Sequence, residues 1–210
     1  MTGKAERIKK MLIKYGYENA GSILNEWNYI KSWDKNFLDN IRTIKSMKGA
    51  AFTAACMSEA QNRGLTDMLM YYDARVDKIY NGMFSSDTME PLKGYYPFKM
   101  FSVLYRLGTQ VKAECESGNI YVTAGKGREG CALMITSYSD DKIKEEQIEI
   151  ELSGLPGGVR TIEYYLLDEN NDMSLVRTDK TTDSVIELET GMYSVWLIKI
   201  QVSAKSGEIR

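Results

Sequence analysis

The sequence contains no histidine, and this absence excludes several kinds of catalytic site. Neither a Ser-His-Asp triad nor a Cys-His pair can form, and no imidazole is present to bind zinc or iron. The acidic segment over 168–172 lacks the twelve-residue pattern of a calcium loop, so a hairpin turn is the favoured interpretation. Hydrolytic chemistry would depend on carboxylates, tyrosines, lysines or an oxygen-ligated metal, and of these we expect no metal site; no cofactor is expected either.

Cysteine and long apolar runs are also scarce. The three cysteines, Cys56, Cys115 and Cys131, are widely spaced, which favours free thiols in a reducing compartment over a disulfide framework. A single Cys115–Cys131 bridge between neighbouring strands is the less favoured alternative. No apolar run reaches the length of a membrane span, and the first residues lack a signal-peptide core. We therefore expect a cytoplasmic protein; secretion stays an alternative because the parent protein can begin upstream of Met1.

The charges are balanced and dispersed. The 27 basic and 29 acidic residues give a net charge of −2 and are interspersed along the chain. A nucleic-acid partner would require basic residues clustered on one face or arm, so none is expected. With 210 residues, of which 43% are hydrophobic, the chain is long enough for one or two domains with a real core.

Up to about Gly108 the pattern alternates helices with short strands. It predicts a helix ending at Gly16, a strand over 22–27, a helical region over 34–63 broken near Gly49, a strand over 66–73 and a helix ending at Gly108. This order implies parallel strands joined by crossover helices. Two such strands would leave bare hydrogen-bonding edges, so they belong to a larger sheet. A full (β/α)8 barrel needs about 250 residues, so any barrel here is partial.

From Gln110 onward, short strands separated by turn residues replace the helices. Eight candidate strands follow, several with alternating apolar residues, and they favour an antiparallel sandwich of the jelly-roll type; they cover 111–116, 120–124, 131–138, 147–152, 161–167, 174–177, 185–188 and 193–200. We therefore predict two domains: a partial (β/α)8 barrel segment over 1–108 and a β-sandwich over 109–210.

The segment Ser22–Asn28 is where we look first for chemistry. Glu26 follows an apolar strand start, and barrel enzymes carry their reactive groups at the carboxyl ends of strands. A carboxylate beside an indole (Trp27) and an amide (Asn28) is suited to cleaving a sugar linkage, because the carboxylate can attack the anomeric carbon. The alternative from spacing alone is a solvated or salt-bridged Glu26, with Trp27 in the core.

Five short motifs in order give this chain a resemblance to a known family. The run Ile23–Asn28 resembles the nucleophile strand of clan A glycoside hydrolases, especially family 39, the β-xylosidases and α-L-iduronidases. The alanine-rich helix start at Gly49–Phe52, the strand end Met70–Asp73, the loop Tyr80–Phe84 and the helix start Tyr95–Phe101 are similar as well. The resemblance implies strands seven and eight of a TIM barrel, followed by a β-sandwich.

The same resemblance assigns roles to individual residues. It implies that Glu26 is the nucleophile of a retaining enzyme, and that the substrate-binding residues are Trp27, Asn28, Tyr71, Tyr72 and Asp73. The family more often has tryptophan where the two tyrosines stand, which leaves the substrate open. The general acid/base of the family lies on the fourth barrel strand, which this chain lacks. Asn25-Glu26 also resembles the Asn-Glu pair of that strand, although the order of elements downstream fits the seventh strand better.

Two interpretations of function follow. The first is a segment of a retaining glycosidase acting on β-xyloside-like or related glycosides, inactive alone because the acid/base is missing. The second is a non-catalytic module that binds carbohydrate or serves a structural or oligomerising role, with candidate rings at Tyr121, Tyr138, Tyr164 and Tyr165. In both cases we expect a carbohydrate partner, no membrane partner, and either a homo-oligomer or association with the missing half of the barrel.

Overall fold

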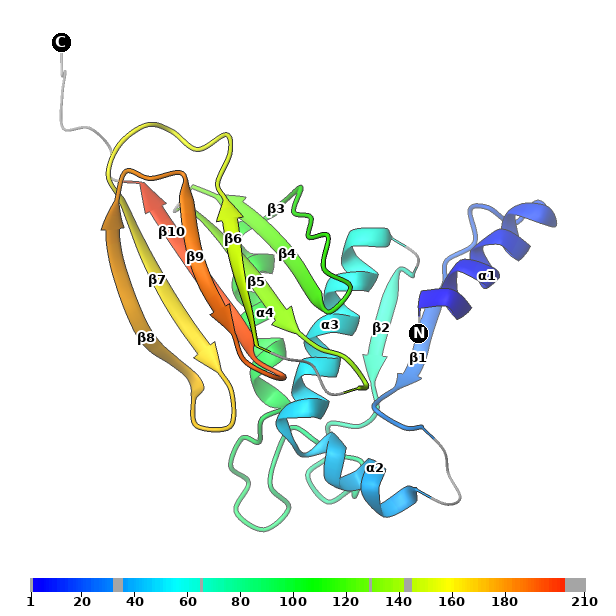
Figure 1. The fold of residues 1–210 in the computed structure, drawn as a ribbon. Coiled ribbons are helices and arrows are strands. Elements are labelled where there is room, and N and C mark those ends of the chain that lie inside the picture. Colours follow the sequence, from blue (N-terminus) through cyan, green and yellow to red (C-terminus); the bar gives the residue numbers. More distant parts are fainter. Residues whose placement is uncertain (1, 32–35, 65, 129, 142–144, 203–210) are drawn as a thin grey trace. The chain divides into compact units, whose positions relative to one another are not determined.

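The computed structural model describes residues 2–31, 36–64, 66–128, 130–141 and 145–202 (Figure 1). The chain divides into two compact units, Met1–Phe98 and Lys99–Arg210, each of which is described by itself. None of the helices in the described ranges is long and apolar enough to cross a bilayer.

The first unit alternates helices and strands, as the sequence predicts. Strands β1 (Ile23–Trp27) and β2 (Met68–Tyr71) pair in parallel, with Ile23 opposite Met68, and the helices between them form the crossover. The helices are α1 (Thr2–Lys14), α2 (Phe37–Ile44), α3 (Met47–Arg63) and α4 (Tyr95–Leu107), of which α4 runs on into the second unit.

The helical region breaks between α2 and α3 at Lys45-Ser46, earlier than the predicted break near Gly49. Ser46 is extended at the start of α3, with φ −100° and ψ 173°. Gly49 lies inside α3 because the end of α2 rests on it. A Cβ at Gly49 would lie 2.7 Å from the carbonyl oxygen of Ile44 and would also collide with that of Thr43. The glycine therefore marks a close helix–helix contact instead of a helix end.

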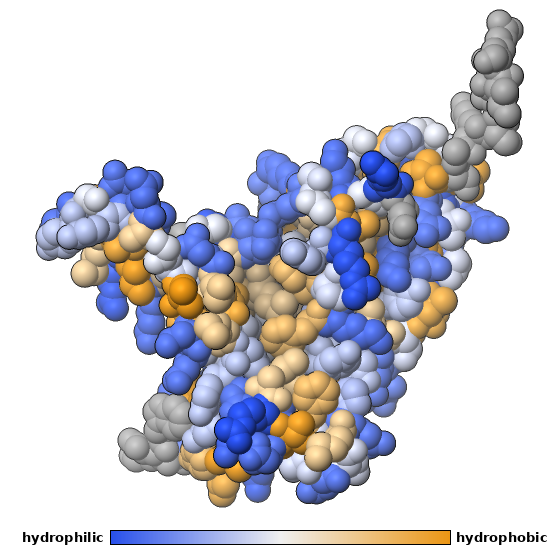
Figure 2. All heavy atoms as spheres, turned by 180° about the vertical axis from the view of Figure 1, so that it is seen from behind, coloured by the Kyte–Doolittle hydropathy of each residue, from blue (hydrophilic) through white to orange (hydrophobic). Residues whose placement is uncertain are grey.

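One face of the β1–β2 pair is covered and the other is open. Trp27 packs against Phe52 of α3, so α3 covers the face that carries Trp27. The opposite face carries Ile23, Met68 and Met70, whose exposed fractions are 58%, 50% and 48%. Figure 2 shows apolar surface gathered over this part of the chain, around α1 and the two strands. Parallel strands are normally buried on both faces, so this surface requires a cover.

The second unit is built from antiparallel strands, and this prediction is confirmed. A six-stranded sheet has the order β3-β4-β5-β10-β7-β8, and a separate pair is formed by β6 and β9. Figure 1 shows β6 and β9 lying over one face of the larger sheet. The strands are β3 (Thr109–Val111), β4 (Ile120–Gly127), β5 (Gly130–Ser137), β6 (Glu146–Glu151), β7 (Arg160–Leu167), β8 (Asp172–Thr181), β9 (Val185–Thr190) and β10 (Val195–Val202).

The core of the second unit lies between these two sheets. Ile162 and Ile198 are fully buried from the large sheet, and Ile186 and Leu188 are 6% and 2% exposed on β9. On β4, a Cβ at Gly127 would lie 2.6 Å from the carbonyl oxygen of Leu107, so the end of α4 lies directly against this strand. Apolar residues at alternate positions of these strands therefore form this core, and the sequence shows the alternation.

Several strand lengths differ from the sequence prediction, and two of the differences follow from strand pairing. The predicted strand over 111–116 is shorter and earlier, because only Thr109–Val111 finds a partner on β4. The predicted strand over 174–177 extends to Asp172–Thr181, because β8 pairs along the whole of β7. All three cysteines are free, so the alternative Cys115–Cys131 bridge is not formed.

We predict that the purified chain self-associates through the open face of β1–β2. Lysine in place of both Met68 and Met70 should shift the chain towards monomer, because burying two charges in an apolar contact is unfavourable. Light scattering at micromolar concentration measures this. Met192→Lys is the matched control, because Met192 is also 48% exposed but belongs to the second unit. A monomeric unmodified chain would contradict the prediction.

Candidate active site

Glu26 lies at the carboxyl end of β1, the position predicted for a catalytic residue. Its side chain is exposed, and it forms no hydrogen bond or ion pair with any residue that the structure describes. The register of β1 against β2 shifts between Leu24 and Trp27, so Glu26 lies in the irregular part of the strand, directly before the buried Trp27. The carboxylate is therefore exposed at the end of the strand pair.

Trp27 is placed in the interior of the first unit. It is 6% exposed, and its ring makes an edge contact with Tyr71 at 5.5 Å between centroids and a tilted contact with Phe52 at 6.3 Å. Its buried indole N–H has no hydrogen-bond partner among the described residues. The ring thus supports the strand end beneath Glu26 and does not face solvent.

Asn28 ties together three segments that meet at the end of the strands. Its side-chain amide donates to the carbonyl oxygens of Tyr72 and Tyr80, the latter at 3.0 Å. Its side-chain oxygen accepts the main-chain N–H of Tyr29 at 2.7 Å. Main-chain pairing adds to this, because the N–H of Tyr72 donates to the carbonyl oxygen of Trp27 at 3.0 Å. The ends of β1 and β2 and the loop after β2 are therefore fixed to one another.

The two predicted tyrosines have different surroundings. Tyr71 is half-buried between Trp27 and Phe98, whose ring centroid lies 5.4 Å from its own. Tyr72 is 37% exposed, and its ring lies 5.8 Å from that of Tyr80 in a tilted arrangement. Only the second tyrosine offers a ring to a ligand at the end of the strands where Glu26 lies.

Burial raises the pKa of Tyr71 to about 12, an effect that hydrogen bonds from the Asn28 side chain and the Gly82 main chain partly offset; the charge of Asp73 raises it further. The space around this hydroxyl is tight. A Cβ at Gly82 would lie 2.8 Å from the Tyr71 oxygen. The phenol is therefore held protonated and in place at ordinary pH, where it acts as a structural group.

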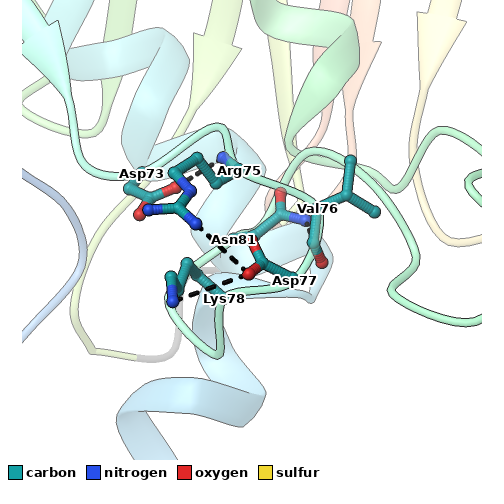
Figure 3. Close-up of polar contacts among 6 residues, drawn as sticks. All are labelled: Asp73, Arg75, Val76, Asp77, Lys78 and Asn81. Carbon is teal, nitrogen blue, oxygen red and sulfur yellow. Dashed lines mark hydrogen bonds and ion pairs between the residues drawn. The ribbon is translucent and has the colours of Figure 1, made fainter.

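Asp73 anchors the loop that follows β2 (Figure 3). It is 8% exposed, follows a cis peptide bond after Tyr72, and accepts the main-chain N–H of Arg75. Further along the loop, Asp77 forms exposed ion pairs with Arg75 at 3.3 Å and Lys78 at 3.6 Å. The carboxylate of Asp73 thus shapes the loop at its first turn.

Sequence reasoning missed the role of Asn81, which folds the rest of this loop. Asn81 is 1% exposed; its side-chain oxygen accepts the main-chain N–H groups of Met83 and Phe84 at 2.9 and 3.0 Å. Its amide nitrogen donates to the carbonyl oxygens of Phe84 at 2.7 Å and Val76 at 3.4 Å. The Asn-Gly pair is a turn signal that could have pointed to this residue.

Tyr80 was also missed as a candidate site residue. Its ring lies between those of Tyr72 and Phe37, at 5.8 and 6.2 Å. Since Asn28 holds its carbonyl oxygen, the ring is presented from a fixed position of the main chain. A pair of tyrosine rings, Tyr72 and Tyr80, therefore lies at the strand ends where Glu26 is exposed.

The tyrosines considered for a carbohydrate-binding face of the second unit do not form a row of exposed rings. Tyr164 is fully buried and Tyr138 is 9% exposed, while Tyr121 and Tyr165 are half-buried. In the ranges that the structure describes, no group of three or more acidic or cysteine side chains could hold a metal ion. Among the described residues at the ends of β1 and β2, the exposed reactive group is therefore the carboxylate of Glu26, and the exposed ring is that of Tyr72.

No protein-family model matches the sequence, and no curated protein matches it either. Solved structures do match, at low sequence identity. A glucosidase from Croceicoccus marinus matches 95% of this chain with a TM-score of 0.70 at 16% identity. An alpha-L-arabinofuranosidase from Thermotoga maritima matches 96% with a TM-score of 0.68 at 14% identity. A GH30 endoxylanase from Clostridium papyrosolvens matches 92% with a TM-score of 0.63 at 12% identity.

The match covers 50%, 48% and 45% of these three proteins, respectively. The chain therefore has the fold of one part of several glycoside hydrolases and spans half of their length or less. In each of them at least as much polypeptide lies outside the matching region as inside it.

Asn28→Ala should lower the free energy of unfolding by about 1–3 kcal/mol, because the carbonyl oxygens of Tyr72 and Tyr80 lose their donor and the bond to Tyr80 is part-buried. Urea denaturation followed by tryptophan fluorescence measures the change. Asn25→Ala is the matched control, because Asn25 is exposed on the same strand and should change stability by less than about 0.5 kcal/mol. Equal stability of the two variants would contradict the role given to Asn28.

The raised pKa of Tyr71, about 12, predicts a stability loss in alkali. A tyrosine ionises at about pH 10 in the unfolded chain. Between about pH 10 and about pH 12 the folded state therefore keeps a proton on Tyr71 that the unfolded state loses. The stabilisation is complete below the unfolded value and disappears as pH rises through the folded one. Tyr71→Phe should flatten the fall in urea midpoint over this range relative to the unmodified chain. Parallel pH profiles for the two proteins would overturn this assignment.

Proposed function

We propose that this chain is the part of a retaining glycoside hydrolase that carries the nucleophile, and that Glu26 is that nucleophile. The observation that carries the proposal is the position of Glu26: an exposed, unshared carboxylate at the carboxyl end of a parallel strand. Barrel enzymes place reactive groups at these strand ends. The match of the fold to a glucosidase, an arabinofuranosidase and an endoxylanase supports the same conclusion.

The finer assignment is a clan A enzyme similar to family 39, acting on β-xyloside-like glycosides. It rests on the resemblance of Ile23–Asn28 and Met70–Asp73 to that family. In this proposal the rings of Tyr72 and Tyr80 pack against a sugar, while Trp27, Asn28, Tyr71 and Asp73 hold the strand ends and the loop in place. Tyrosine rings offer both an apolar face and a hydroxyl, which suits a pentose.

The mechanism requires a second carboxylate. A retaining enzyme needs a general acid/base about 5–5.5 Å from the nucleophile. Ile23, Met68 and Met70 are exposed on the open face of β1–β2, beside the exposed end of β1 that carries Glu26. We propose that the acid/base comes from polypeptide that covers this face, either the missing half of the barrel or a second chain. The isolated chain would then form a glycosyl ester only with a leaving group that needs no proton.

With the nucleophile on this chain and the acid/base on other polypeptide, two results are expected for the purified chain. A dinitrophenyl β-xyloside with fluorine in place of the hydroxyl beside the anomeric carbon should esterify Glu26, because dinitrophenolate leaves without acid catalysis. Mass spectrometry of the digested protein locates the label. A methyl β-xyloside, whose leaving group needs a proton, should not be hydrolysed.

Two variants control this experiment. Glu26→Gln should abolish labelling, whereas Glu18→Gln, another exposed glutamate of the first unit, should leave it unchanged. Label on any other residue, or no label at saturating reagent, would contradict the role of Glu26. Hydrolysis of the methyl xyloside by the chain alone would show that the acid/base is already present.

A further inference from the structure

The second sheet of the sandwich is narrow, and one of its edges borders a groove. In the described part of the chain β6 pairs with β9 alone, so its other edge has no neighbouring strand. A cavity of about 750 Å³ lies along this edge, within the second unit. The groove is thus an opening into the sandwich between β6 and the segment that joins β3 to β4.

Two continuous segments of the chain line the groove and form its two banks. One bank is the continuous run Ile148–Leu155, and the other is the continuous run Val111–Glu116. On β6 the edge that borders the groove is unpaired among the described residues, because β9 occupies the other edge. An unpaired strand edge presents N–H and C=O groups that are ready to bind another extended segment.

The floor of the groove is apolar. It is formed by inward-facing residues of the large sheet, among them Val122, Ala124, Cys131 and Leu133. A volume of several hundred Å³ with apolar walls is typical of sites that receive apolar groups. Side chains entering from a strand beside β6 would complete the core that Ile148 and Ile150 begin.

The outer face of the β6–β9 pair is acidic, and this predicts the charge of any segment that binds beside β6. Glu149 lies directly opposite Glu187, and Gln147 lies opposite Glu189. Like charges directly opposite on paired strands destabilise the pairing, and a basic neighbour would relieve the repulsion. On the far bank, Lys112 is already paired with Glu114 at 2.8 Å. A second copy of β6 would add further glutamates, so it is not the segment that fits.

We propose that this groove binds an extended polypeptide segment in which apolar residues alternate with lysine or arginine. The segment adds to β6 as a third strand, with its apolar residues on the floor and its basic residues beside Glu149 and Glu151. Its length is about six residues, that of β6 itself. Matching glycoside hydrolases contain as much polypeptide again outside the matching region, which is a source of such a segment.

The test uses the full 210-residue chain and a capped synthetic hexapeptide of alternating valine and lysine. Hydrogen exchange measured residue by residue by NMR should be slowed at least about tenfold by this peptide for the β6 amides on the edge away from β9, because these amides gain strand partners. A peptide of the same composition, with three lysines followed by three valines, should leave these amides unchanged.

Variants identify the groove as the binding site. Ala124→Trp fills the floor and should abolish the protection, whereas Val176→Trp, at a 44%-exposed position on β8, should not. Ala124→Leu replaces the first variant if circular dichroism shows that it does not fold. Glu149→Gln combined with Glu151→Gln should weaken binding.

Three results would overturn the proposal: no protection by the alternating peptide, equal protection by the block peptide, or protection that persists in the Ala124 variant. Binding of anilinonaphthalene sulfonate without amide protection by either peptide would assign the groove to small apolar molecules instead. None of these measurements depends on glycosidase activity, so their failure is independent of any failure at Glu26.

Discussion

The parallel pairing of β1 with β2 is the constraint from which the rest of the first unit follows. Parallel strands cannot be joined by a tight turn, so the chain must include the crossover that α2 and α3 provide. The same pairing brings both carboxyl ends to one place, and Asn28 then joins them to the loop after β2. Glu26 is exposed there, next to the buried Trp27. The candidate site is thus a direct product of strand direction.

Much of this could be predicted from the sequence, because it depends on local periodicity. The strand beginning at Ile23, the crossover helices and the antiparallel strands of the second half all follow from spacing of apolar residues, and the structure confirms them. The boundary near Gly49 could not be predicted, because a glycine required by the approach of α2 looks the same as a glycine that ends a helix. Strand lengths such as that of β8 depend on a partner far along the chain.

The candidate site was predictable only in its outline. Glu26, Asn28 and Tyr72 could be placed near one another because they follow or end two parallel strands. Sequence alone does not reveal that Asn28 uses its amide on two carbonyl oxygens, or that Asn81 is buried inside its loop, because both depend on how a long connection returns to the strand ends. Tyr80 reaches the site through that same return. Contacts between segments 50 residues apart are set by tertiary structure, and local patterns do not encode them.

In the loop after β2, one set of residues determines the shape of the main chain and another set determines the surface charge. Its shape depends on the buried side chains of Asp73 and Asn81, whereas Arg75, Asp77 and Lys78 form exposed ion pairs, which contribute little to stability. Evolution can therefore exchange these surface charges while the main chain beside Glu26 keeps its course. A lineage carrying this fold can change the charge of this loop without rebuilding the scaffold, and this loop is where such changes would accumulate first.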